Sequence, residues 1–221
     1  MSALRIEVFW SFRSPYSYLA TPRLAEIAQR YEVEVDVRPV YPLAVRVDGF
    51  FKRQDRRWPA YVARDARRLA QMLGMPFGPP RPDPIVMDFA TGNVPAEQPY
   101  IRRLTHLGQA AADRGRALPF ILEVSRLIWG GDVDGWNQGD HLARATQRAG
   151  LDLAELESTI GERADELETA IQASHTRLEQ VGHWGVPTFV FDDEPFFGQD
   201  RIEVLLWRMR QHGLKPRSAA G

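Results

Sequence analysis

Strand-like alternation of apolar and polar residues occurs only near the two ends of this chain, and that distribution constrains the fold more than any other feature. Residues 4–10 and 33–37 alternate with the period of two that is typical of β-strands. Strand character returns at 185–191, where a turn at 192–194 leads to a short partner strand at 195–197. The sequence therefore predicts one sheet assembled from both ends of the chain.

Helical spacing of apolar residues fills most of the remaining chain. The pattern predicts a first helix from Pro15, a last helix after Gly198, and the following helices between them: 58–74, 100–114, 117–129, 140–149, 153–160 and 163–181. Residues 41–58 lose this periodicity. Residues 75–99 hold seven prolines, a density that excludes regular structure and often borders a functional cleft.

The order strand, helix, strand, helical block, hairpin and helix predicts an α/β protein. We expect a mixed sheet with helices on both faces and a large all-helical insertion. Residues 1–45 and 182–215 are assigned to the discontinuous sheet domain, 46–181 to the helical insertion and 216–221 to a C-terminal tail. Trp129 is expected in the core or in a cleft wall.

Composition removes several classes of function. The formal net charge of −1, from 28 basic and 29 acidic residues, gives no general attraction to nucleic acids or anionic membranes. Cysteine is absent, so any sulfur chemistry needs a ligand that brings the sulfur. The histidines are scattered, without the spacing of metal ligands, so no metal site is expected. With no apolar leader and no apolar run of membrane-spanning length, a cytoplasmic protein is expected.

The first strand-to-helix turn predicts a defined anion site. Ser14 followed by Pro15 is typical of an N-cap with proline at the first helical position. The unpaired amides and the dipole of such a helix end carry about half a positive charge, which favours a phosphate, a carboxylate or a thiolate. From these residues alone, Ser14 either binds an anion or only caps the helix.

Four motifs, taken together, resemble a known family. They are Ser14-Pro15-Tyr16-Ser17-Tyr18-Leu19-Ala20, Trp129-Gly130, Gly185-Val186-Pro187-Thr188-Phe189 and Phe197-Gly198-Gln199-Asp200-Arg201. Their order and spacing are similar to the DsbA-like branch of the thioredoxin superfamily that contains kappa-class glutathione transferases and 2-hydroxychromene-2-carboxylate isomerases. The resemblance covers essentially the whole chain and implies a thioredoxin-like fold. Ser14 and Ser17 stand where redox members carry Cys-x-x-Cys, so no disulfide exchange is expected.

The resemblance implies glutathione as the cofactor. Its thiol would lie against Ser14, whose hydroxyl would stabilise the thiolate. The resemblance also implies a cis peptide bond at Val186-Pro187, with the Val186 backbone pairing with the cysteinyl part of the tripeptide. Asp200 would bind the γ-glutamyl ammonium, with Gln199 beside it. Asp200 is also an ordinary N-cap for the last helix.

One departure from the family concerns the loop after the second strand. Relatives carry a Gly-Asn element there, and the asparagine is missing from residues 47–53. Lys52 or Arg53 would contact a ligand carboxylate instead, because basic side chains cluster here; the alternative is that the cluster is only a solvated surface. Its members are Lys52, Arg53, Arg56 and Arg57. The Gly92-Asn93 pair lies much later and is not taken as the equivalent element.

By resemblance, the reaction is the interconversion of 2-hydroxychromene-2-carboxylate and trans-o-hydroxybenzylidenepyruvate during breakdown of naphthalene-like aromatics. The partners would be glutathione and a small aromatic carboxylate or electrophile, and relatives suggest a homodimer. An aryl slot is expected from aromatic residues near the mouth of the first helix: Phe12, Tyr16, Trp184 and Phe197. Two alternatives stay open, a kappa-like glutathione transferase or peroxidase and a non-redox thioredoxin-like binding module.

Overall fold

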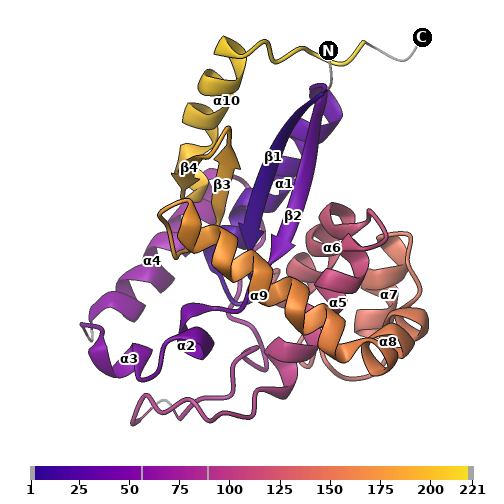
Figure 1. Ribbon diagram of the computed structural model, residues 1–221. Coiled ribbons are helices and arrows are strands. Elements are labelled where there is room, and N and C mark those ends of the chain that lie inside the picture. The colour runs from indigo at the N-terminus through magenta and orange to yellow at the C-terminus, as the bar shows by residue number, and fades with distance from the viewer. Residues whose placement is uncertain (1–2, 56, 89, 219–221) are drawn as a thin grey trace.

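The computed structural model describes residues 3–55, 57–88 and 90–218 (Figure 1). Both ends of the chain contribute to one mixed sheet with the strand order β2-β1-β3-β4. β1 pairs parallel with β2 and antiparallel with β3, and β3 pairs antiparallel with β4. The strand bounds are β1 Leu4–Trp10, β2 Val33–Pro39, β3 Thr188–Phe191 and β4 Glu194–Phe197. The predicted α/β fold class is confirmed.

The helices follow the predicted order. Their bounds are α1 Pro15–Arg30, α2 Leu43–Arg46, α3 Phe50–Arg53, α4 Arg57–Met72, α5 Pro99–Ala112, α6 Ala117–Trp129, α7 His141–Arg148, α8 Leu153–Glu162, α9 Ala164–Gln180, η1 Gln199–Arg201 and α10 Ile202–Gln211. The short helices α2 and α3 lie in the segment where the sequence predicted no periodic structure, because four residues are too few to show a helical period. Among the described residues, no helix is both long enough and apolar enough to cross a membrane.

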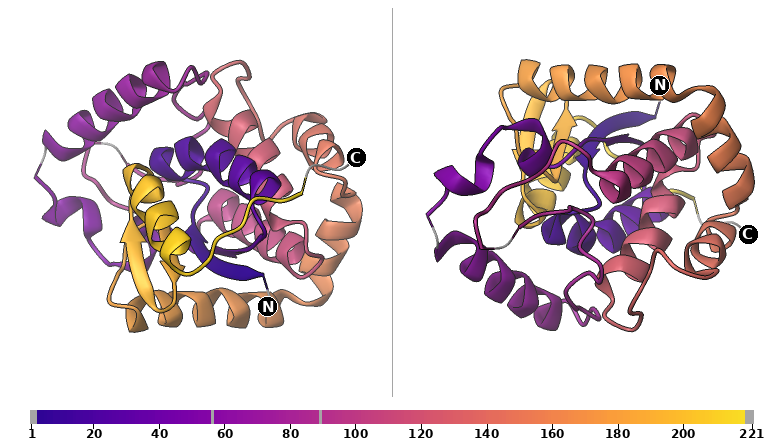
Figure 2. Two further views of the ribbon diagram at one scale, coloured as in Figure 1. Left: turned by 90° about the horizontal axis from the view of Figure 1, so that it is seen from above. Right: turned by 90° about the horizontal axis from the view of Figure 1, so that it is seen from below.

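Helices cover both faces of the sheet, as predicted. Figure 2 shows α1 and α10 on one side of the strands and α9 on the other. Successive side chains of β1 point to opposite faces, so Val8 joins the core under α1 while Phe9 packs with Leu178 of α9. The turn that follows β1 and opens α1 is therefore held between two packed layers.

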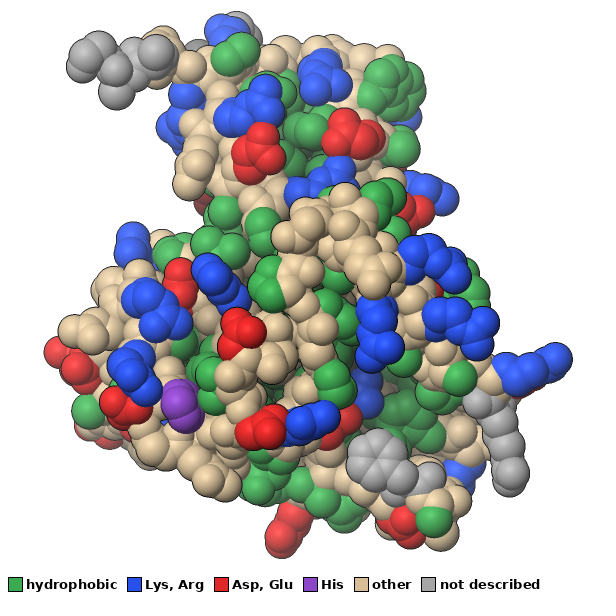
Figure 3. All heavy atoms as spheres, turned by 180° about the vertical axis from the view of Figure 1, so that it is seen from behind, with side chains coloured by type: hydrophobic (Ala, Val, Ile, Leu, Met, Phe, Trp, Pro, Cys, Tyr) green, Lys and Arg blue, Asp and Glu red, His purple; other side chains and the backbone are tan. Residues whose placement is uncertain are grey.

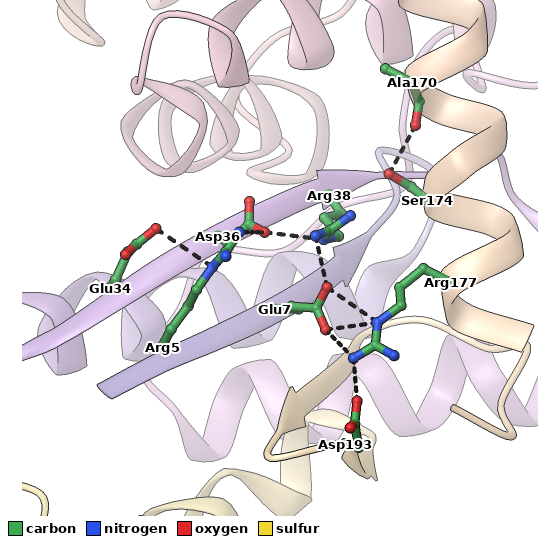
Figure 4. Close-up of polar contacts among 9 residues, drawn as sticks. All are labelled: Arg5, Glu7, Glu34, Asp36, Arg38, Ala170, Ser174, Arg177 and Asp193. Carbon is green, nitrogen blue, oxygen red and sulfur yellow. Dashed lines mark hydrogen bonds and ion pairs between the residues drawn. The ribbon is translucent and has the colours of Figure 1, made fainter. Parts of the chain in front are cut away.

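An ion-pair cluster fixes α9 to the sheet (Figure 4). Glu7 of β1 accepts hydrogen bonds from Arg177 of α9 at 2.8 Å and lies 2.8 Å from a guanidinium nitrogen of Arg38 on β2. Arg177 also donates to Asp193 in the β3–β4 turn at 2.6 Å. Hydrogen bonds to Glu7 and Asp193 raise the pKa of Arg177. One helix, two strands and a turn are thus joined by a single set of charges.

The helical block and the sheet share a continuous core, and Trp129 is buried within it. Helix α9 lies within the predicted helical insertion and contacts both parts of the core: Leu167 packs in the main core, whereas Leu178 packs against the sheet. The division of the chain into domains therefore stays a prediction. Part of the expected tail is paired with the link between α1 and β2, since Pro216 forms a bridge with Tyr31. Residues 219–221 and Arg56 of the basic cluster lie outside the described residues.

Candidate active site

The mouth of α1 has the predicted cap. The backbone of Ser14 is extended, Pro15 occupies the start of the helix, and the amide of Ser17 donates to Ser14 Oγ at 3.2 Å. The N-cap prediction is confirmed. The Ser17 side chain is fully buried, and its hydroxyl has no hydrogen-bond partner among the described residues. The mouth therefore combines a helix dipole with two serine hydroxyls in a sequence without thiols.

The loop before β3 lies directly against this mouth. The Val186-Pro187 peptide bond is cis, as predicted. Ser14 Oγ donates to the carbonyl of Val186 at 3.4 Å, a long hydrogen bond between residues 172 positions apart. The structure thus brings together the two motifs that carried most of the site prediction, and a ligand at the mouth would meet both.

Two further contacts hold the mouth in place, and sequence reasoning did not identify either one. Arg13 donates two hydrogen bonds to Asp83 of the proline-rich segment, at 3.1 and 2.9 Å. The Tyr16 hydroxyl donates to Asp65 of α4 at 2.9 Å. Burial, together with the hydrogen bond to Asp65, raises the pKa of Tyr16. Asp65 and Asp83 carry no recognisable local motif, so their pairing with the mouth could not be read from the chain.

Aromatic rings gather at the loop that precedes Val186. His183 stacks on Trp184 with ring centroids 4.7 Å apart and on Phe197 at 4.3 Å. The outer rings are open to solvent, with Trp184 61% and Phe197 49% exposed. The amide of Gly185 donates to His183 Nδ1 at 3.0 Å, and burial lowers the pKa of His183. A Cβ at position 185 would lie 2.5 Å from the Phe197 ring, so a larger residue there would displace that ring.

The expectation that Phe12 lines an aryl slot is wrong. Its ring is fully buried and packs edge-on against Trp10 at 4.6 Å and Phe120 at 6.1 Å. Gly108 of α5 permits this position, because a Cβ there would lie only 3.1 Å from the ring. The carbonyl of Phe12 accepts a hydrogen bond from the buried Trp129 indole at 2.9 Å. Phe12 therefore supports the mouth from beneath.

Asp200 does not cap the last helix. Residues 199–201 form the 3₁₀ turn η1, and the Asp200 carboxylate accepts from Arg201 at 2.8 Å. Neither η1 nor α10 has a side-chain capping bond, so the expected second role of Asp200 is wrong. The Asp200 side chain is exposed and can meet a ligand. Gln199 is buried, and its carbonyl accepts from Arg23 of α1 at 2.8 Å.

A cavity of about 360 Å³ lies among α2, α3, the loop 92–96 and the first turn of α5. Lys52 lines this cavity, whereas Arg53 is not among the described residues that do so. Gly92 and Asn93 line it as well, so two loops distant in sequence meet here. Seen from behind, Lys and Arg side chains border a depression with a hydrophobic floor on the side of the molecule that carries α4 (Figure 3).

Beneath Arg102, which also lines this cavity, lies a polar cluster. The Tyr41 hydroxyl donates to Glu168 of α9 at 2.6 Å, and His106 Nε2 lies 3.0 Å from the same carboxylate oxygen. Although burial favours the neutral acid, hydrogen bonds from Tyr41, Gln172 and His106 lower the pKa of Glu168 to about 2. The carboxylate is therefore charged and already well supplied with donors.

Comparisons with known proteins agree with this architecture. A family model described as a DSBA-like thioredoxin domain matches residues 5–210. The chain is 26% identical over 204 residues to 2-hydroxychromene-2-carboxylate isomerase of Sphingobium xenophagum, covering 90% of this chain and 95% of that protein. It is 21% identical over 224 residues to glutathione S-transferase kappa 1 of Rattus norvegicus, covering 96% and 93%. A solved 2-hydroxychromene-2-carboxylate isomerase superimposes with a TM-score of 0.70 at 21% identity, covering 95% and 96%. The predicted resemblance is confirmed.

Proposed function

Because the chain belongs to the DSBA-like thioredoxin domain family, we propose that it is a glutathione-dependent enzyme that holds the thiolate of glutathione at Ser14. The observation that carries this proposal is the meeting of a serine-capped helix mouth with the Val186-Pro187 loop in a chain without cysteine. The name of the kappa-class relative supports glutathione as the source of the missing sulfur.

Ser14 would act as a hydrogen-bond donor and not as a nucleophile. The Ser14 hydroxyl donates to the Val186 carbonyl with Oγ 3.4 Å from the carbonyl oxygen, which is a weak hydrogen bond. A thiolate at the mouth could replace that carbonyl as the acceptor. A free thiol has a pKa of about 8.5, and a helix N-terminus together with a donor lowers that value. Lowering by about 2 units corresponds to about 2.7 kcal/mol in favour of the thiolate, which makes it the main form at neutral pH.

The rest of the tripeptide would extend along the loop and η1. The Val186 main chain would pair with the cysteinyl part of glutathione, with Pro187 fixing the end of the loop. The exposed carboxylate of Asp200 would bind the γ-glutamyl ammonium, and the backbone of Gln199 would lie beside it. Each of these roles follows from the family resemblance, and the exposed position of Asp200 is compatible with it.

The proposed reaction is isomerisation of 2-hydroxychromene-2-carboxylate. The thiolate adds to the conjugated system and forms a C–S bond; the ring opens, a former double bond rotates, and elimination of the thiolate restores conjugation. Tyr16 and Trp184 would border the aryl ring. Lys52, which lines the cavity whereas Arg53 is not among the described residues that do so, would meet the carboxylate. The isomerase relative of Sphingobium xenophagum supports this choice.

A second candidate is glutathione transfer to an electrophile. The similarity to glutathione S-transferase kappa 1 over 96% of the chain favours it, and it requires the same thiolate. The two reactions differ in product, because transfer leaves the sulfur bonded to the electrophile, whereas isomerisation releases it. A homodimer and a cytoplasmic location stay predictions.

The test is isothermal titration of glutathione into the protein and into Ser14→Ala, followed by assays with the chromene carboxylate and with a generic electrophile. We expect the wild-type protein to bind glutathione and Ser14→Ala to lose at least about tenfold in thiol-dependent activity, since one charge-assisted hydrogen bond is removed. Absence of binding at millimolar glutathione would remove the proposal. Product analysis distinguishes the isomerase from the transferase.

A further inference from the structure

The cavity among α2, α3, the loop 92–96 and α5 is positively charged. Its basic residues are Arg46, Lys52 and Arg102, and Asp48 is the acidic residue in the same lining. The volume of about 360 Å³ lies within the range of small-molecule sites. An anionic group would therefore gain attraction there from more than one direction.

The donors in this cavity differ in how much they are already engaged. Arg46 is committed to the fold, because it donates to the carbonyls of Tyr41 at 2.9 Å and Trp184 at 2.5 Å. Among the described residues, the Lys52 ammonium and the Asn93 side-chain amide have no hydrogen-bond partner, and both residues are exposed.

Arg102 is only loosely paired. Its guanidinium lies 4.0 Å from Glu168, beyond hydrogen-bond distance, and 5.4 Å from the centroid of the Tyr41 ring. Glu168 accepts its short hydrogen bonds from Tyr41 and Gln172 instead. The Arg102 side chain is 48% exposed. Its donors are thus free to turn toward an anion in the cavity.

The cavity and the helix mouth are linked through the loop that precedes Val186. Arg46 contacts the carbonyl of Trp184, two residues before Val186, and Val186 contacts Ser14 Oγ at 3.4 Å. Two residues span at most about 7 Å, so the Arg46 guanidinium lies within about 13 Å of Ser14 Oγ. A tripeptide spans about 10 Å from end to end, and glutathione carries its thiol on the central residue. From a thiol held at the mouth, the glycyl carboxylate therefore extends about half that distance toward the cavity.

We propose that this cavity is a carboxylate-binding subsite in which Lys52, Arg102 and Asn93 supply the hydrogen-bond donors. A carboxylate is chosen over other anions because this inference rests on the proposed function, whose ligands carry carboxylates. The group is either the glycyl carboxylate of glutathione or the carboxylate of the aromatic substrate. Arginine and lysine both suit a carboxylate, and Asn93 adds a neutral donor from the loop 92–96.

The experiment uses paired acid and neutral probes in isothermal titrations. One pair is glutathione and its glycine ethyl ester, and the other is trans-cinnamate and cinnamamide, which contain no thiol. Each probe is titrated into the wild-type protein, Lys52→Gln, Arg102→Gln and the control Arg53→Gln. Arg53 is the matched control because it follows Lys52 on α3 and is not among the described residues that line the cavity. Thermal unfolding checks that each variant is folded.

We expect at least one acid probe to bind the wild-type protein and to lose about tenfold in affinity in both Lys52→Gln and Arg102→Gln, with little change in Arg53→Gln. Its neutral counterpart should bind weakly and be insensitive to these substitutions. If only glutathione loses affinity in the two variants, the subsite binds the glycyl carboxylate. If only cinnamate loses affinity, the subsite binds the carboxylate of the aromatic substrate. Binding of cinnamate alone would support the subsite while removing glutathione from the account. If no acid probe shows the pattern, or if Arg53→Gln is equally affected, the subsite is overturned. As long as glutathione itself binds the wild-type protein, that outcome leaves the role of Ser14 untouched.

Discussion

His175 on α9 holds the segment between β2 and α2 in place, and its protonation is expected to destabilise the fold. The Tyr41 amide donates to His175 Nε2 at 2.9 Å, so that nitrogen must be unprotonated. The other ring nitrogen lies 3.1 Å from the Gln172 side-chain oxygen, which can accept its proton. Burial and the nearby positive charge of Arg46 lower the pKa of His175 to about 4, and Glu168 acts weakly in the opposite direction.

The magnitude follows from the shift in pKa. An unfolded histidine titrates at about 6.5, so between pH 6.5 and 4 the unfolded chain binds a proton that the folded chain does not. Stability is therefore lost as the pH falls through this window, by about 3 kcal/mol in total and about 2 kcal/mol by pH 5. For a chain of this size, 2 kcal/mol corresponds to a decrease in Tm of about 4–8 °C.

The assay is urea and thermal unfolding of the wild-type protein and of His175→Gln at pH 7 and pH 5. Glutamine can accept from the Tyr41 amide but does not titrate, so groups other than His175 contribute equally to both proteins. We expect the wild-type protein to lose about 2 kcal/mol more than the variant between the two pH values. Equal losses in the two proteins would show that protonation of His175 does not destabilise the fold.

Two further substitutions test contacts that support the site. Trp129→Phe should lower the free energy of unfolding by about 2 kcal/mol in urea titrations, because it leaves the buried Phe12 carbonyl without its donor; an unchanged midpoint would contradict that role. Glu7→Gln should cost about 2 kcal/mol by the same measurement, since Arg38 and Arg177 lose a shared partner. Glu34 lies 3.5 Å from Arg5 in an exposed ion pair on the same sheet, and Glu34→Gln should cost less than about 0.5 kcal/mol. Comparable losses in Glu7→Gln and Glu34→Gln would show that the shared carboxylate has no special importance.

Local sequence signals were sufficient for the helix mouth and the sheet. Ser14-Pro15 identifies the N-cap because capping depends on neighbouring residues only. The alternation in β1 and β2 identifies the strands, since period two reflects the pleat itself. The family motifs then identified the cis bond at Val186-Pro187, which no local propensity would have required.

Features that depend on three-dimensional packing were not accessible in the same way. Phe12 lies beyond the end of β1, so strand alternation no longer determined its direction, and Gly108 of α5 made room for it in the core. Lys52 and Asn93 share a cavity although their loops are far apart in sequence, and no pattern within either loop indicates the other. Asp200 resembled an N-cap because the 3₁₀ turn that precedes α10 has no strong sequence signal.

The most direct measurement is the thiol pKa of bound glutathione, followed by the ultraviolet absorbance of the thiolate as the pH is raised. We expect a midpoint about 2 pH units below that of the free thiol in the wild-type protein, and a return toward the free value in Ser14→Ala. A bound thiol that titrates like free glutathione, or a midpoint that does not respond to Ser14→Ala, would contradict the claim that this serine holds the sulfur as an anion.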